Sequence, residues 1–185
     1  TDLFQINNQK AKVKNSILFL GRISPSKNVD VFIEALRILK KRGIIFWANI
    51  YGDALSKDAV YLEKLKLRAL ALDLEGVLQF HSGVPNYKTP EIYNTHEIYV
   101  NLSSSGMYDK TIFEAMACRC LVLVSNDNLK DQIDKRLIIT TREAEIVANF
   151  LAFALSLSEG EKKKMIKEEV EFAKTHSLPA LADKL

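Results

Sequence analysis

The amino-acid sequence predicts an α/β domain in which helices flank an open parallel sheet of the Rossmann type. Two observations support this fold. Five short apolar runs have the length of strands, and the segments between them show the apolar periodicity of amphipathic helices. Strands that alternate with helices form parallel βαβ units with right-handed crossovers. The chain has 185 residues, 48% of them hydrophobic, which is sufficient for one large domain or two very small ones.

The apolar runs define the expected strands. Three of the runs are nearly continuous in apolar residues, which is typical of strands buried on both faces of a sheet. The five runs cover residues 17–20, 46–51, 77–80, 98–102 and 121–124. A further short strand over residues 137–140 is an open alternative to a loop at that point.

Helical patterns separate the runs. The first expected helix has apolar residues at positions 29, 32, 33, 36 and 39, which is the spacing of one helical face, and Gly43 follows it as a C-cap. The other expected helices cover residues 62–72, 89–95, 111–118, 143–157 and 159–176. Residues 1–15 are interpreted as a hinge or linker segment, and residues 16–185 as the folded domain.

Composition excludes several classes of protein. The net charge is 26 − 23 = +3, which is too mild to indicate a nucleic acid partner but suits a small anionic ligand or a weak membrane contact. The first residues lack the apolar stretch of a signal peptide, and no run approaches the length of a membrane span. Cys118 and Cys120 are therefore interpreted as reduced, packed thiols. The lysines at positions 10, 12, 14 and 162–164 are expected to form solvated faces, with lipid head groups as the alternative.

The carboxyl ends of the predicted strands form one edge, and ligands bind beyond this edge in open parallel sheets. Four of the seven glycines lie there: Gly21, Gly52, Gly83 and Gly106. Glycine lets a backbone approach a ligand closely, although ordinary turns at strand ends use glycine as well.

Positive charge gathers at the same edge. Arg22, Lys27 and Lys110 follow predicted strands, and the helices that begin near Asn28 and Thr111 should point their N-termini there. Helix N-termini attract anions through free N–H groups and the helix dipole. We therefore predict a site for a multiply charged anion, with a diphosphate as the natural candidate. For each residue alone, a solvated loop charge is the alternative.

Glu114 has two interpretations. Its spacing from Thr111 fits a capping box, with Thr111 as the N-cap, and spacing alone favours this cap over a ligand contact. The sequence contains no G-x-G-x-x-G, Walker A, H-E-x-x-H or G-x-S-x-G motif, and no Asp-x-Asp pair for a metal–diphosphate. His81, His96 and His176 have no evident partner and are interpreted as structural or surface residues. The residues alone therefore indicate a nucleotide or phosphate ligand without a defined reaction.

Two sequence blocks resemble the C-terminal, donor-binding domain of GT-B glycosyltransferases, in the retaining group 1 (family 4) class. The stretch "LGRISPSKNVDVFIEAL" is similar to the family's GR-x-x-x-x-KG strand–loop–helix, and "FEAMACRCLVLVSN" is similar to its LEAMACGxPVVxS block. The tripeptide "YGD" resembles the end of the family's second strand. The resemblance covers almost the whole chain and implies a GT-B C-terminal half, with residues 16–185 as the nucleotide-sugar-binding domain.

The resemblance implies a role for each matching residue. Arg22 and Lys27 match the catalytic pair that grips the donor diphosphate and neutralises charge on the leaving group. Glu114 matches the glutamate that accepts hydrogen bonds from the ribose hydroxyls, and residues 80–84 should lie near the base. The remaining substrate-binding matches are Gly21, Gly106, Met107, Tyr108, Asp109, Lys110 and Thr111.

Three positions depart from the family pattern. Gly106 occupies the place of the first glutamate of the Glu-x7-Glu signature, which normally touches the donor sugar. Asn28 replaces the glycine that follows the lysine, and Arg119 replaces the helix-ending glycine. A left-handed backbone is expected at the end of that helix.

The implied activity is transfer of a sugar from a nucleotide-diphosphate sugar to an acceptor with retained configuration, without a metal or another cofactor. The acceptor site belongs to an N-terminal domain that this stretch does not contain, so the chain alone is expected to be inactive. A module of the same shape that binds nucleotide or phosphate without transfer is the alternative. The expected location is the cytoplasm, with peripheral contact to the inner face of the membrane left open.

Overall fold

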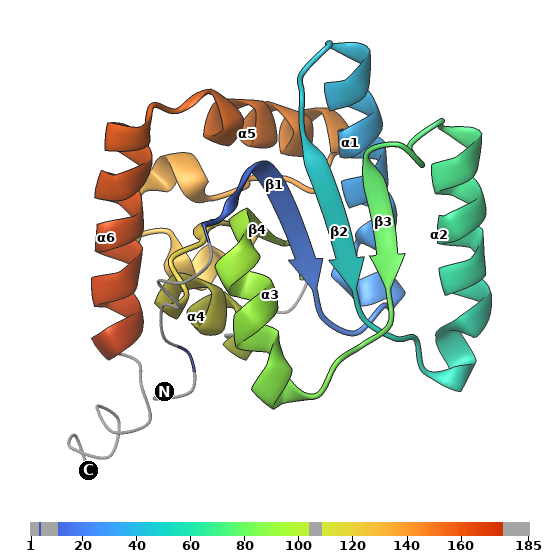
Figure 1. Ribbon diagram of the computed structural model, residues 1–185, viewed down its shortest axis with the longest axis horizontal. Coiled ribbons are helices and arrows are strands. Elements are labelled where there is room, and N and C mark those ends of the chain that lie inside the picture. Colours follow the sequence, from blue (N-terminus) through green and yellow to red (C-terminus); the bar gives the residue numbers. More distant parts are fainter. Residues whose placement is uncertain (1–3, 5–10, 104–108, 176–185) are drawn as a thin grey trace.

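The computed structural model describes residue 4, residues 11–103 and residues 109–175 (Figure 1). Its centre is a five-stranded sheet in the order β3-β2-β1-β4-β5, in which all neighbouring strands run parallel. The strands are β1 (Val13–Leu20), β2 (Trp47–Tyr51), β3 (Leu78–His81), β4 (His96–Asn101) and β5 (Leu121–Val124). The predicted open parallel sheet is therefore confirmed.

Helices flank this sheet in two groups. One group is α1 packed against α2 and α5, and the other is α4 packed against α3 and α6. Figure 1 shows α3 in front of the sheet and α1 behind it. The helices are α1 (Val29–Lys41), α2 (Ala59–Ala71), α3 (Thr89–Thr95), α4 (Lys110–Ala117), α5 (Ala144–Ser156) and α6 (Glu159–Thr175). Each predicted helix is present, with ends that differ by a few residues.

The start of the domain differs from the sequence prediction. β1 begins at Val13, so residues 13–15 belong to the sheet although they were assigned to the linker. The strand extends beyond its apolar run because Val13 still pairs with His96 of β4. Asn15 has a φ of 59°, and the pairing with β4 shifts register between Val13 and Ile17. The backbone N–H of Asn15 donates instead to the carboxylate of Glu97 at 2.8 Å.

The alternative strand at residues 137–140 does not form. Leu137 ends a single 3-10 turn (Lys135–Leu137), and Ile138 makes one isolated bridge to Val124. The Asp134 side chain accepts a hydrogen bond from the backbone N–H of Arg136 and so caps that turn. A capped turn this close to the bridge leaves too few extended residues for a strand.

Two of the lysines expected at the surface point inward. The Lys12 ammonium donates to the carbonyls of Tyr93 at 2.8 Å and of His96 at 2.7 Å, at the C-terminal end of α3. Lys162 is 6% exposed and pairs with Glu97 at 3.2 Å. For these two lysines both earlier interpretations, a solvated face and a lipid contact, are wrong.

In the described part of the chain, no helix has the length and apolar character of a membrane span. The cytoplasmic location stays a prediction.

Candidate functional site

Glycines leave the carboxyl edge of the sheet bare. The backbone N–H of Gly21 donates to the Tyr51 carbonyl at 3.0 Å, and that of Gly52 donates to the His81 carbonyl at 3.1 Å. A Cβ atom on Gly52 would lie 1.9 Å from the carbonyl oxygen of Gly21, so no other residue fits there. A Cβ on Gly21 would meet open space. The backbone at the end of β1 is therefore open to a ligand, whereas Gly52 at the end of β2 is packed against it.

Lys27 reaches from the loop after β1 to the far side of this edge. Its ammonium donates to the Ser103 hydroxyl at 2.9 Å and to the Asp109 carboxylate at 2.5 Å. Arg22 is exposed and forms no hydrogen bond or ion pair with the rest of the described chain. The two predicted cations therefore differ, because Lys27 is held in place and Arg22 has no partner among the residues that the structure describes.

Asp109 is the N-cap of α4. Its carboxylate accepts hydrogen bonds from the Thr111 backbone N–H at 3.3 Å, from the Thr111 hydroxyl at 2.9 Å and from the Asn101 amide at 3.1 Å. Burial would raise the pKa of Asp109, but the Lys27 ammonium and the hydrogen bonds from Lys27, Thr111 and Asn101 outweigh burial and lower the pKa to about 2. Asp109 is therefore a carboxylate at neutral pH.

This arrangement corrects the capping box. The predicted N-cap was Thr111, but Asp109 takes that position two residues earlier, so Glu114 cannot act as its reciprocal partner. Glu114 is 8% exposed, and its carboxylate accepts hydrogen bonds from the Tyr93 hydroxyl at 3.1 Å and the Asn86 amide at 3.2 Å. Lys110 lies 3.6 Å from it. Glu114 is thus positioned by three side chains and free of the capping role.

A buried polar chain supports the start of α4. The Tyr99 hydroxyl donates to the Thr111 hydroxyl at 2.7 Å, and the backbone N–H of Ser103 donates to the Asn101 side chain at 3.0 Å. Tyr99 is fully buried, and burial raises the pKa of its hydroxyl. Sequence reasoning missed Tyr99, Asn101 and Ser103. The signal was available, because "YVNLSSS" places polar residues at the end of an otherwise apolar strand.

Two residues that replace family glycines adopt left-handed backbone. Asn28 has φ 51° and ψ 42° at the start of α1, and its side-chain amide donates to the Leu102 carbonyl at 2.6 Å. Arg119 has φ 56° after α4, as expected for the helix-ending position. Asn tolerates this conformation better than most residues. The Asn28 bond also ties the loop after β1 to the end of β4.

Arg142 is a further cation at this edge that sequence reasoning missed. Its guanidinium donates to the Ser103 carbonyl at 3.2 Å and the Ser125 carbonyl at 3.1 Å. No local motif marks Arg142, because it precedes α5 and reaches the site only through the fold.

The predicted residues Gly106, Met107 and Tyr108 lie outside the described residues.

The described histidines have structural partners. His81 contacts the Asn49 side chain at 2.7 Å, Asn49 contacts His96 at 3.0 Å, and His96 contacts the Ile92 carbonyl at 2.7 Å. Tyr51 stacks on His81 with ring centroids 4.1 Å apart. Burial lowers the pKa of both histidines. These hydrogen bonds support the interpretation of both histidines as structural residues.

Both cysteines are free and buried, which confirms that they are packed thiols.

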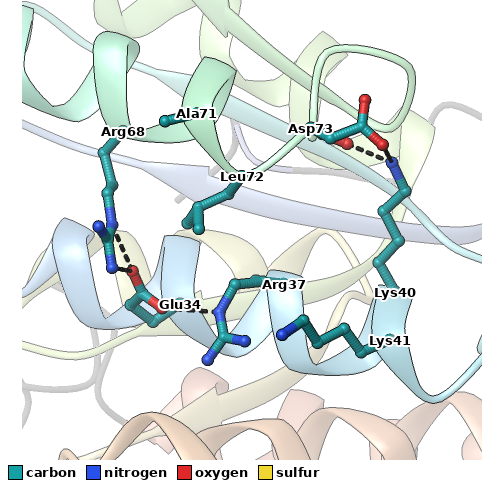
Figure 2. Close-up of a pocket in the computed structure, with 8 residues that line it drawn as sticks. All are labelled: Glu34, Arg37, Lys40, Lys41, Arg68, Ala71, Leu72 and Asp73. Atoms are coloured by element: carbon teal, nitrogen blue, oxygen red, sulfur yellow. Dashed lines mark hydrogen bonds and ion pairs between the residues drawn. The ribbon is translucent and has the colours of Figure 1, made fainter.

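A pocket of about 660 Å³ lies between α1 and α2, away from the predicted site. Figure 2 shows Glu34 between Arg37 and Arg68, at 2.9 Å and 2.5 Å from them, and Lys40 paired with Asp73 at 2.7 Å. Lys40 is in the last turn of α1, which lies at the amino ends of the strands because a crossover helix runs back along its sheet. The Glu34–Arg68 pair joins α1 to α2, and the Lys40–Asp73 pair joins the end of α1 to the loop after α2, at the opposite end of the domain.

Metal ligands do not gather in the described part of the chain. No group of three or more His, Cys, Asp or Glu side chains there could hold a metal ion. Whether the reaction uses a metal is a separate matter, and metal independence stays a prediction.

A family model describes the chain as a whole. The model for glycosyl transferases group 1 matches residues 2–171. The chain belongs to the glycosyl transferases group 1 family. Its five-stranded parallel sheet with flanking helices has the fold of GT-B glycosyltransferase C-terminal domains.

Individual relatives agree with the family. The chain is 27% identical, over 128 residues, to the lipopolysaccharide core biosynthesis mannosyltransferase LpcC of Rhizobium leguminosarum bv. viciae. The aligned residues make up 69% of this chain and 35% of that protein. The solved C-terminal domain of a glycosyl transferase group 1 family protein (LpcC) from Francisella tularensis matches with a TM-score of 0.79 and 19% identity over 94% of this chain and 95% of that one. Anabaena Alr3699/HepE, solved with UDP and glucose, matches with a TM-score of 0.75 and 20% identity over 88% of this chain and 44% of that one.

Proposed function

We propose that this chain is the donor-binding domain of a retaining glycosyltransferase and holds a nucleotide-diphosphate sugar at the carboxyl edge of its sheet. The observation that carries the proposal is the convergence of Arg22, Lys27 and the N-terminus of α4 on the open backbone at Gly21. An anion is the ligand that suits two cations and a helix N-terminus, and it would share Lys27 and the start of α4 with the Asp109 carboxylate or displace it. Membership of a glycosyltransferase family supports the same ligand class.

The chemistry follows from where charge develops. When the bond between sugar and phosphate breaks, negative charge grows on the departing nucleoside diphosphate. Cations fixed before the reaction stabilise that charge without reorganising. Lys27 suits this role because Ser103 and Asp109 hold its ammonium in one place. Arg22 supplies a charge that no carboxylate of the described chain offsets.

Glu114 would bind the ribose of the donor. A carboxylate accepts hydrogen bonds from two neighbouring hydroxyls, and the Tyr93 and Asn86 side chains fix its orientation. Because Asp109 caps α4, Glu114 need not serve as a cap. The nucleotide of the donor is identified only as a nucleoside diphosphate; UDP is one candidate, because a protein of similar fold was solved with it.

The acceptor site belongs to the rest of the protein in this proposal. The chain spans 35% of the length of the mannosyltransferase that it resembles, so an N-terminal domain would supply the acceptor and close the cleft. We expect the isolated chain to bind the donor and to transfer no sugar. We also expect binding to be unchanged by a metal chelator, since Arg22 and Lys27 take the place of a cation. Normal turnover by the isolated chain would contradict the proposal.

The test is a thermal-shift panel on the full 185-residue chain. UDP-, GDP-, ADP- and dTDP-sugars are compared with inorganic phosphate. A ligand at 100 times its Kd adds about 2.7 kcal/mol to the free energy of unfolding. Arg22→Ala and Lys27→Ala should abolish the shift, whereas Lys64→Ala, on the exposed face of α2, should keep it. A shift with phosphate alone would favour the alternative, a phosphate-binding module of the same shape.

A further inference from the structure

Arg142 joins the ends of two neighbouring strands. It lies just before α5, and its Nε donates to the Ser125 hydroxyl at 3.1 Å. Its Nη2 donates to the Ser103 carbonyl at 3.2 Å and to the Ser125 carbonyl at 3.1 Å. Ser103 follows β4 and Ser125 follows β5. One guanidinium therefore fixes the backbone where both strands reach the carboxyl edge.

Ser103 links this guanidinium to Lys27. The Ser103 hydroxyl accepts a hydrogen bond from the Lys27 ammonium at 2.9 Å and lies 3.3 Å from the Asp109 carboxylate. Ser103 is only 5% exposed, and the backbone N–H of Ser103 donates to the Asn101 side chain at 3.0 Å. The carbonyl of this buried residue thus accepts from Arg142 at 3.2 Å and from the Ser125 hydroxyl at 3.5 Å, whereas its N–H and hydroxyl contact other side chains.

The partners of Arg142 differ from those of several other arginines. Arg37, Arg42, Arg68 and Arg136 each pair with a carboxylate. Within the described residues, Arg142 bonds only carbonyl and hydroxyl oxygens, so its charge has no acidic partner there. The contacts of Arg142 instead use its planar fork to fix a backbone position.

We propose that Arg142 is a positioning residue of the donor site, which fixes Ser103 and through it the place of the Lys27 ammonium beside Asp109. The importance of this position for donor binding rests on the proposed function, but the positioning itself does not. A residue that merely joined β4 to β5 would affect stability and leave the surroundings of Lys27 unchanged.

The test measures Lys27 directly in the full chain. Arg142→Met removes the charge and all three hydrogen bonds, and Arg142→Lys keeps the charge but loses the second nitrogen that donates to the Ser125 hydroxyl. Arg136→Met is the matched control, because Arg136 pairs with Asp134 on the segment that leads to Arg142. Acylation of each lysine is followed by mass spectrometry, with the exposed Lys64 as internal reference. Affinities for UDP and GDP are measured by calorimetry on the same samples.

Both Arg142 variants should raise the acylation rate of Lys27 relative to Lys64 by about threefold, the effect of weakening one partly exposed ion pair. They should also lower nucleotide affinity by about tenfold, whereas Arg136→Met changes neither. An unchanged Lys27 rate in both variants would overturn the proposal. If Arg142→Met does not fold, Arg142→Lys carries the comparison. If Lys27 responds but the unaltered chain binds no nucleotide, the positioning role holds and the proposed function fails.

Discussion

The Lys27 ammonium lies 2.5 Å from the Asp109 carboxylate, and this ion pair joins the loop after β1 to the N-cap of α4. The side chains are 25% and 17% exposed, so the pair is only partly screened by water. It holds a cation at the edge of the sheet before any ligand arrives. A diphosphate that binds there would share Lys27 with Asp109 or displace Asp109 from it. This ion pair therefore affects both the stability of the domain and the binding of an anion.

The Asp109 carboxylate should stabilise the domain in a defined pH window. Its pKa of about 2 is lower than the ordinary value, so its contribution is present above about pH 4 and is lost as the pH falls through about 2. We expect roughly 2 kcal/mol to disappear across that window. Asp109→Asn should remove this loss from urea unfolding curves recorded at several pH values. Asp131→Asn, at an exposed aspartate, is the control, and equal slopes for both variants would rule out the effect.

Glu114 should distinguish ribose from deoxyribose. Glu114→Gln keeps one oxygen acceptor but loses the charge, so the affinity for UDP should fall by about tenfold, the strength of one charge-assisted hydrogen bond. The affinity for 2′-deoxy-UDP should fall less, because that ligand has one hydroxyl fewer. Calorimetric titration measures both ligands, with Glu63→Gln on α2 as the control. An equal loss for the two nucleotides would show that Glu114 does not contact the 2′-hydroxyl.

Gly52 should tolerate no side chain. Gly52→Ala places a methyl group against the Gly21 carbonyl oxygen, a backbone atom that cannot turn aside, so we expect a loss of about 3 kcal/mol or more. Gly160→Ala in α6 is the matched control, because its Cβ meets nothing within 4 Å. That change should stabilise the chain by about 0.5 kcal/mol. Chemical unfolding measures both variants, and a stable Gly52→Ala chain would contradict the described edge.

Arg119→Gly should stabilise the chain. Arg119 donates its backbone N–H to the Met116 carbonyl, and Cys120 donates to the Ala115 carbonyl, which together form a Schellman motif. The left-handed φ of 56° costs a non-glycine residue about 1 kcal/mol, of which glycine recovers part. A rise of a few degrees in the unfolding midpoint is expected, with nucleotide affinity unchanged. Lower stability would mean that the Arg119 side chain contributes more than the backbone costs.

Glu169 should make the domain less stable as the pH rises. This buried carboxyl on α6 accepts hydrogen bonds from the Val122 backbone N–H, at 3.1 Å to one oxygen. Burial, together with Asp134 and Glu168 nearby, raises its pKa well above the ordinary value. Because the folded chain then binds the proton more tightly than the unfolded chain, its stability falls as the pH climbs above the unfolded pKa. Glu169→Gln should flatten this decline in midpoints measured from pH 5 to pH 8; an unaltered decline would assign it to another group.

Apolar periodicity was sufficient to predict the sheet and its helices, because burial determines which faces those elements present. The five apolar runs became the five strands. The start of β1 was placed too late because Lys14 and Asn15 interrupt the apolar run, although Val13 before them still pairs with His96. Sheet pairing depends on a neighbouring strand, which local sequence does not reveal.

The candidate site was predictable in part. Glycines and cations after the strands pointed to the edge, and the fold brings Lys27 and Asp109 together there. The capping box at Thr111 failed because Asp109, two residues earlier, accepts the Thr111 backbone N–H that Glu114 would have bonded in that box. Arg142 was out of reach for sequence reasoning, since its partners Ser103 and Ser125 are 39 and 17 positions away along the chain.

The most direct measurement is a nuclear magnetic resonance titration of the ¹⁵N-labelled chain with UDP, GDP, ADP and dTDP, in which the backbone amide of each residue reports its own surroundings. Our account predicts that one of these nucleotides shifts the amides of Gly21, Lys27 and Thr111 at the carboxyl edge and leaves those of Arg37 and Arg68 in place. Shifts confined to the pocket between α1 and α2, or no shift with any of these nucleotides, would contradict it.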